Sequence, residues 1–341
     1  MLTGCLRPAR CAAAFPLLAA ALSASCGGGE AAGPGVGVGT NLTLTVEALA
    51  ALDAQREGWY EAWLVDGAGR AHSVARFAAA SGPIAFQSPA ADVRELYITV
   101  EPPGADDGIP SERRLLRGGF RAGRAELTVA DALTRVGLLQ ETPGTFTMFT
   151  PSDNDTAPYP SHEEAGVWLF NVQPRETPQN DMWVRLTPLH AGWTYEGWMV
   201  RDLGSPGEIW LSYGKFVPDA TGALSEKDDT GWGPFSGVVN YRTDAVEEFP
   251  GDDWISNPLG LPFPAELSLP LNLRERNASG QLRWTHVITV EPASDRGEPI
   301  GSERPFGLRP YRDLFGDFGS GVPRKITYRP EAVPRGLVEV R

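Results

Sequence analysis

Short stretches in which apolar and polar residues alternate occur along much of the chain. Residues 42–46 read Leu-Thr-Leu-Thr-Val, the period-2 pattern of a strand that buries one face. Residues 98–100 are all β-branched, and the turn-forming sequence Glu101-Pro102-Pro103-Gly104 follows them directly. Helical periodicity is scarce, and the only helix we expect is a short one over residues 130–136. Short strands separated by turns predict an all-β protein built from antiparallel sheets.

Four sequence blocks occur twice, in the same order. The first copy contains YEAWLV (60–65), SVARF (73–77), ITVEP (98–102) and Ser-Glu-Arg (111–113), and the second contains YEGWMV (195–200), SYGKF (212–216), ITVEP (288–292) and Ser-Glu-Arg (302–304). Ile98 follows Phe77 by 21 positions, whereas Ile288 follows Phe216 by 72, so the second copy carries an insertion over roughly 217–267. We therefore expect two repeated antiparallel β-sandwich-like modules, the second with a long loop insertion.

The repeats and the composition of the remaining segments predict the organisation of the chain. We expect a signal peptide over 1–25, a glycine-rich tether over 26–39, the first module over 40–122, a bridging segment over 123–164, the second module over 165–313 and a C-terminal tail over 314–341.

The N-terminal segment has the layout of an export signal. Arg7 and Arg10 form a basic start, residues 12–22 are apolar, and the small residues Ser23-Ala24-Ser25 lead into Cys26. This arrangement resembles the lipobox of bacterial lipoproteins, although that family prefers Leu where this chain has Ser23. The resemblance implies that Cys26 is acylated and anchors the chain to a membrane. The alternative is an ordinary secretory signal that is cleaved nearby.

We expect the mature chain to lie in the cell envelope. Gly27 lacks the negative charge that retains some lipoproteins at the inner membrane, which favours the outer membrane. Cys5 and Cys11 lie in the segment that would be removed, so Cys26 would have no partner for an internal disulfide.

The order of the repeated blocks resembles the extracytoplasmic C-terminal module of the anti-sigma-K factor family. In that family a Tyr-x-x-Trp strand, a Gly-x-Phe strand and a Thr-x-Glu-Pro strand end recur in a β-rich domain. The first copy fits over about 42–120, and the second over about 184–308 without its insertion. Family members hold a sigma factor through a cytoplasmic, often zinc-bearing region that precedes a membrane-spanning helix. The sequence contains no such His/Cys cluster or helix, so the resemblance implies the outer β module and not sigma-factor binding.

Composition and charge restrict the partners. The 39 Gly, 30 Pro, ten Trp and fourteen Phe suit short strands and many turns better than a helical bundle. A net charge of −13 and the absence of a basic stripe argue against nucleic acid as a partner. The partners that we expect are a membrane, through a lipid on Cys26, and an envelope protein or glycan.

The sequence offers no catalytic constellation. The histidines are scattered and show no metal-binding spacing: His72, His162, His190 and His286. No Gly-x-Ser-x-Gly motif is present. His286 lies in a strand block, where a structural role is the simpler interpretation. Glu101 and Glu291 occupy equivalent positions, which favours hydrogen bonding at a strand-to-turn corner over a catalytic pair. We therefore expect no catalytic residue, no metal and no cofactor.

The insertion carries the candidate ligand-binding residues Trp232, Phe235, Asp252, Asp253 and Trp254. Aromatic rings beside carboxylates on a loop can form a platform for a sugar or a peptide. The alternative is that the rings pin the loop to its module. The acidic clusters at 153–155, 228–229 and 252–253 contain oxygen ligands that suit calcium, but none follows the EF-hand pattern and such residues are common in turns.

These observations predict a lipid-anchored cell-envelope protein with a non-enzymatic binding, scaffolding or sensing role. The alternative is an envelope enzyme that acts on carbohydrate or peptide through carboxylates of the inserted loop.

Overall fold

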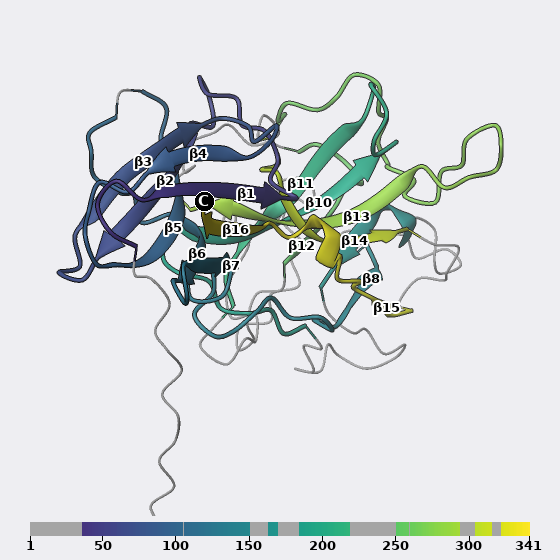
Figure 1. Ribbon diagram of the computed structural model, residues 1–341. Helices are drawn as coiled ribbons and strands as arrows, with labels where there is room; N and C mark the ends of the chain where they lie inside the picture. The colour runs from purple at the N-terminus through teal and green to yellow at the C-terminus, as the bar shows by residue number, and fades with distance from the viewer. Residues whose placement is uncertain are drawn as a thin grey trace, which may run out of the picture. The chain divides into compact units, whose positions relative to one another are not determined.

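The computed structural model describes residues 36–104, 106–150, 163–169, 184–218, 250–258, 260–293, 304–315 and 322–341. All of them belong to one compact unit, Gly33–Arg341. They form sixteen β-strands and two single-turn 3-10 helices, η1 (Glu163–Ala165) and η2 (Pro330–Ala332). Neighbouring strands within the sheets are antiparallel (Figure 1). The all-β class expected from the alternating pattern is confirmed.

Each repeat contributes one four-stranded sheet of its own. The first repeat has the order β3-β2-β5-β6, and the second has the order β11-β10-β13-β14. The strands are β2 (Trp59–Asp66), β3 (Ala71–Phe77), β5 (Val93–Glu101) and β6 (Arg114–Gly119), and then β10 (Trp193–Arg201), β11 (Ile209–Phe216), β13 (Trp284–Pro292) and β14 (Leu308–Leu314). A bulge lies at the same place in both, after Ala62 and after Gly197. The repeat seen in the sequence is therefore a structural repeat.

The other sheet of each repeat contains a strand that the other half of the chain supplies. The sheet orders are β4-β1-β16-β7 in the first repeat and β12-β9-β8-β15 in the second. The strands are β1 (Asn41–Glu47), β4 (Ile84–Gln87), β7 (Arg124–Leu127), β8 (Thr145–Met148), β9 (Gly166–Trp168), β12 (Gly251–Asp253), β15 (Arg324–Lys325) and β16 (Arg335–Val340). In chain order, strands β1 to β8 correspond one by one to strands β9 to β16. By this correspondence β8 and β16 are equivalent eighth strands, and the two repeats exchange them.

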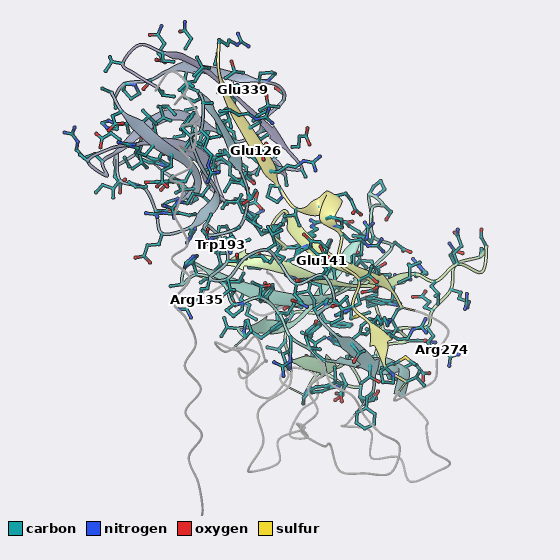
Figure 2. All side chains as sticks on the ribbon, turned by 60° about the horizontal axis from the view of Figure 1, so that its bottom comes forward. Glu126, Arg135, Glu141, Trp193, Arg274 and Glu339 are labelled. Carbon is teal, nitrogen blue, oxygen red and sulfur yellow. The ribbon has the colours of Figure 1, made fainter. Side chains whose placement is uncertain are left out.

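β16 occupies a central position in its sheet. It pairs with β1 from Leu42–Val340 to Glu47–Arg335, and on its other edge it pairs with β7. Val338 is fully buried in the core that also contains Leu44. Figure 2 shows the strand that carries Glu339 beside Glu126 of β7. The segment 314–341, expected to be a tail, thus contains a strand that completes the first repeat.

A buried hydrogen-bond network recurs on the two sheets. Trp63 Nε1 donates to Thr99 Oγ1 over 2.9 Å, and Thr99 Oγ1 in turn donates to Glu101. The Glu101 carboxylate also accepts the backbone N–H of Ser111 at 3.0 Å, beyond the turn. This network closes the corner between β5 and β6.

The second repeat contains the equivalent network. Trp198 Nε1 donates to Thr289 Oγ1 over 3.0 Å, Thr289 donates to Glu291, and Glu291 accepts the backbone N–H of Phe306. The expectation that Glu101 and Glu291 accept hydrogen bonds at strand-to-turn corners is confirmed. Both carboxylates are buried, so these bonds satisfy acceptors that burial would otherwise leave without water.

One difference between the cores of the two repeats involves three residues that lie close together. Ala62, Val74 and Leu96 of the first repeat correspond to Gly197, Tyr213 and His286 of the second. The Tyr213 ring lies over Gly197, where a Cβ atom would be 1.7 Å from Tyr213 Cζ. The Tyr213 hydroxyl is 2.9 Å from His286 Nε2. Glycine therefore makes room for a buried Tyr–His pair that the first repeat lacks.

The short helix expected over residues 130–136 is not formed. Asp131 has a φ of 57°, in the left-handed region, which interrupts right-handed helical geometry. The chain instead makes a turn in which the N–H of Leu133 bonds to the carbonyl of Val129. Thr134 then forms a bridge with Leu189, so this segment joins the bridging region to the start of the second repeat.

Candidate functional site

A cavity of about 390 Å³ is lined by the loop that follows β1, by strands β13 and β14 of the second repeat, and by η2. We call it the arginine pocket, and its lining residues are Ala48, Leu49, Ala50, Leu203, Val287, Gly307, Arg309, Arg312, Arg329, Glu331 and Ala332. Six of these residues are alanine, leucine or valine, and three are arginines. The pocket therefore combines an apolar surface with a concentration of positive charge.

Local backbone geometry shapes the wall of this pocket. Ala48 has a φ of 54°, which turns the chain as it leaves β1. Ala50 then packs so closely against Gly307 that a Cβ on Gly307 would be 2.2 Å from Ala50 Cβ. The absence of a side chain at Gly307 allows the 48–50 loop of the first repeat to contact β14 of the second.

The three pocket arginines have no ion pair with a carboxylate in the part of the chain that the structure describes. Arg329 donates to the backbone carbonyl of Arg312 at 3.2 Å, and Arg309 Nε is 3.5 Å from the carbonyl of Phe306. Arginines elsewhere are paired differently: Arg201 bonds to Glu275 at 2.9 Å and Arg117 to Glu95 at 2.6 Å. Glu331 is the single acidic residue among the described residues that line the pocket, so these residues give it positive charge in a chain whose net charge is −13.

Arg309 is held in place by an aromatic ring. Its guanidinium carbon lies 4.4 Å from the centroid of Trp210, and Trp210 Nε1 donates to Glu208 at 2.9 Å. Burial lowers the pKa of Arg309 from its ordinary value, although an arginine remains charged at neutral pH. Trp210 also packs on the cluster of Trp198, Val200 and Val287, which forms the apolar side of this sheet. The positive charge at Arg309 is therefore partly desolvated and fixed in orientation.

The structure describes three of the five residues proposed from the insertion, and none of these three is on the surface. Asp252 and Asp253 lie in β12, paired with β9, and Trp254 follows them; all three are 0% exposed. The Trp254 backbone N–H donates to Ala165 at 2.8 Å, and its side chain belongs to the main hydrophobic core. Trp232, Phe235 and the anchor residue Cys26 lie outside the described residues.

The histidines that the structure describes do not converge. His72 Nε2 contacts Asp66 Oδ2 at 3.0 Å, and this hydrogen bond is the main cause that lowers the pKa of Asp66. His286 is fully buried beside Phe146 and Tyr213, and burial lowers its pKa to about 3. The imidazole is therefore neutral at physiological pH. A neutral, buried imidazole is consistent with the structural role expected for His286.

No group of three or more His, Cys, Asp or Glu side chains that could hold a metal occurs among the described residues. These described residues also include no helix with the length and apolar character needed to span a membrane.

Sequence reasoning missed the pocket arginines because they belong to no motif. Arg309 has a structural counterpart in Arg114. Arg114 lies two residues before Leu116, which pairs with Ile98. In the same way, Arg309 lies two residues before Tyr311, which pairs with the equivalent residue Ile288. Arg114 also covers an aromatic ring, that of Tyr97, at 4.6 Å. An arginine over an aromatic ring is thus common to both repeats, but the sequence alone does not align β6 with β14.

Comparisons of the chain with protein-family models, with curated proteins and with solved structures find no match.

Proposed function

We propose that this protein is a lipid-anchored cell-envelope protein that binds an organic anion with an apolar body, without catalysing a reaction on it. The anchor is Cys26, and the binding site is the arginine pocket. One observation carries the ligand assignment: three arginines without a carboxylate partner among the described residues surround an apolar floor. The β modules that hold this pocket are proposed to be of the anti-sigma-K extracytoplasmic type.

The chemistry of the lining residues supports this class of ligand. Guanidinium groups bind carboxylates through charge-assisted hydrogen bonds with two donors in a fixed plane. Leu49 and Leu203 are partly exposed apolar side chains beside the arginines. A ligand with an apolar body would therefore remove apolar surface from water while its anionic group pairs with a guanidinium. A volume of about 390 Å³ also lies within the range typical of small-molecule sites.

A set of three probes tests this assignment on the full chain. We expect octanoate, which has both a carboxylate and an apolar chain, to bind in isothermal titration calorimetry. Octanol lacks the charge and acetate lacks the chain, so each should bind roughly tenfold or more weakly than octanoate. Arg312→Gln and Arg309→Gln should each weaken octanoate binding by roughly 10- to 100-fold, because each removes a charge-assisted hydrogen bond.

Arg121→Gln is the matched control, because Arg121 is exposed and lies outside the arginine pocket. This variant should bind octanoate as the wild type does. Equal affinity of octanoate for the wild type and for Arg309→Gln, with the fold intact by circular dichroism, would show that the pocket is not the site. Equal binding of octanol would remove the role of the charge.

A further inference from the structure

A second cavity, of about 230 Å³, is lined by the last residue of each Ser-Glu-Arg block found in the sequence. We call it the junction cleft, and its lining residues are Asp53, Arg56, Glu57, Pro102, Pro103, Arg113, Glu291, Pro292, Arg304 and Phe306. Arg113 and Arg304 are the last residues of the two blocks. Each repeat thus contributes one of these arginines to the cavity.

Contacts between the repeats hold the walls of this cleft together. Trp193, at the start of β10, donates its indole N–H to the carbonyl of Arg114 over 3.0 Å. The Trp193 ring also packs on Phe306, with centroids 5.9 Å apart. Pro102 and Pro292, which also line the cleft, each have a φ angle that the ring fixes.

The carboxylates of the cleft accept hydrogen bonds from the backbone. Asp53 Oδ1 accepts the N–H of Gln55 at 3.0 Å, and Glu57 Oε2 accepts the N–H of Asp53 at 2.6 Å. Glu291 accepts the N–H of Phe306 through both oxygens, at 2.8 and 2.9 Å. Each of the three carboxylates thus has at least one oxygen bonded to a backbone N–H.

The arginine side chains of the cleft, unlike these carboxylates, have no hydrogen-bond partner among the described residues. Within the described residues, the guanidinium groups of Arg56, Arg113 and Arg304 form no hydrogen bond or ion pair with the protein. Their donors are therefore available to a ligand. Guanidiniums that line one cavity from both repeats suit a ligand with an anionic group at each end.

We propose that the junction cleft is a second site, which binds a small dicarboxylate between Arg113 and Arg304. Its volume is below that of a drug-sized ligand site, which restricts the ligand to a short molecule. The planar fork of arginine matches a carboxylate better than a point charge does. This site is separate from the arginine pocket, because the described residues that line the two cavities do not overlap.

Calorimetry on the full chain with succinate, glutarate and inorganic phosphate tests this proposal. Succinate or glutarate should bind, and Arg113→Gln and Arg304→Gln should each weaken the binding by roughly 10- to 100-fold. The double variant should show no detectable binding. Arg113→Lys, which keeps the charge but loses the planar fork, should also bind the dicarboxylate more weakly than the wild type.

Two control variants separate this site from the arginine pocket and from nonspecific charge effects. Arg312→Gln, in the arginine pocket, and Arg121→Gln, exposed on the first repeat, should both bind the dicarboxylate normally. Unchanged succinate binding in the double Arg113/Arg304 variant, or no binding of either dicarboxylate to the wild type at millimolar concentration, overturns the proposal. Phosphate binding as tight as that of succinate overturns the dicarboxylate assignment.

Discussion

Ending the chain at Pro334 is expected to unfold the first repeat, although the deleted strand follows β7 by more than 200 positions in the sequence. β16 lies between β1 and β7, so its loss leaves two strands without a partner on that side. The deletion also removes Val338, which is fully buried in the core. Each of the six residues of β16 contributes backbone pairing worth about 1 kcal/mol net, and Val338 adds about 2 kcal/mol. The total approaches the stability of a typical domain.

Hydrogen exchange measured by mass spectrometry should locate the effect of this truncation. Amides of β1 and β7 should lose their protection, whereas those of β10 and β13 should keep most of theirs, because their sheet contains no residue of β16. Glu339→Gln is the control, since this side chain is exposed and the backbone pairing remains. Loss of protection mainly in β10 and β13 would contradict the strand exchange, because it would assign β16 to the second repeat.

Gly197→Ala is expected to destabilise the second repeat by about 3 kcal/mol, at the upper end of typical overpacking costs. The added Cβ would lie 1.7 Å from Tyr213 Cζ and 2.2 Å from its hydroxyl oxygen. The ring cannot move aside easily, because Tyr213 is fully buried, packs on Phe216 with centroids 6.3 Å apart, and bonds to His286. Thermal unfolding followed by circular dichroism gives the size of the loss.

Restoring the residues of the first repeat should reverse most of this loss. The triple variant Gly197→Ala, Tyr213→Val and His286→Leu recreates the set Ala62, Val74 and Leu96, which packs without a polar pair. The matched control is Ala62→Gly, which should cost about 1 kcal/mol because it adds backbone freedom without creating a clash. A triple variant no more stable than Gly197→Ala would show that the clash with Tyr213 is not the cause.

The sequence predicted the longer strands, but not the partners of the short ones. Alternation marked β1, in which Leu42 and Leu44 are buried, because burial on one face imposes a period of two. The blocks around Trp63 and Trp198 marked β2 and β10 as apolar runs, and both strands are buried on both faces. β15 has two residues and β8 has four, which is too short for a recognisable pattern. Pairing of β16 with β1 depends on contacts between the ends of the chain, and local propensity contains no information about them.

The candidate sites could be anticipated only in part. The repeated Ser-Glu-Arg blocks pointed to Arg113 and Arg304, but not to their convergence on one cavity, which requires the packing of the two repeats. Arg329 lies in the segment expected to be a tail, and only the fold brings it beside Arg309. Asp252 and Asp253 suggested a loop because acidic residues are common in turns, yet pairing with β9 buries them.

Metabolic labelling with a fatty-acid probe is the most direct test of the proposed place of this protein in the cell envelope. Wild type, Cys26→Ala and the control Cys11→Ala are compared in fractionated cells. The wild type and Cys11→Ala should take up the label and remain with the membranes, whereas Cys26→Ala should lose both the label and the membrane association. A labelled, membrane-bound Cys26→Ala protein, or an unlabelled wild type released into the medium, would contradict anchoring through Cys26.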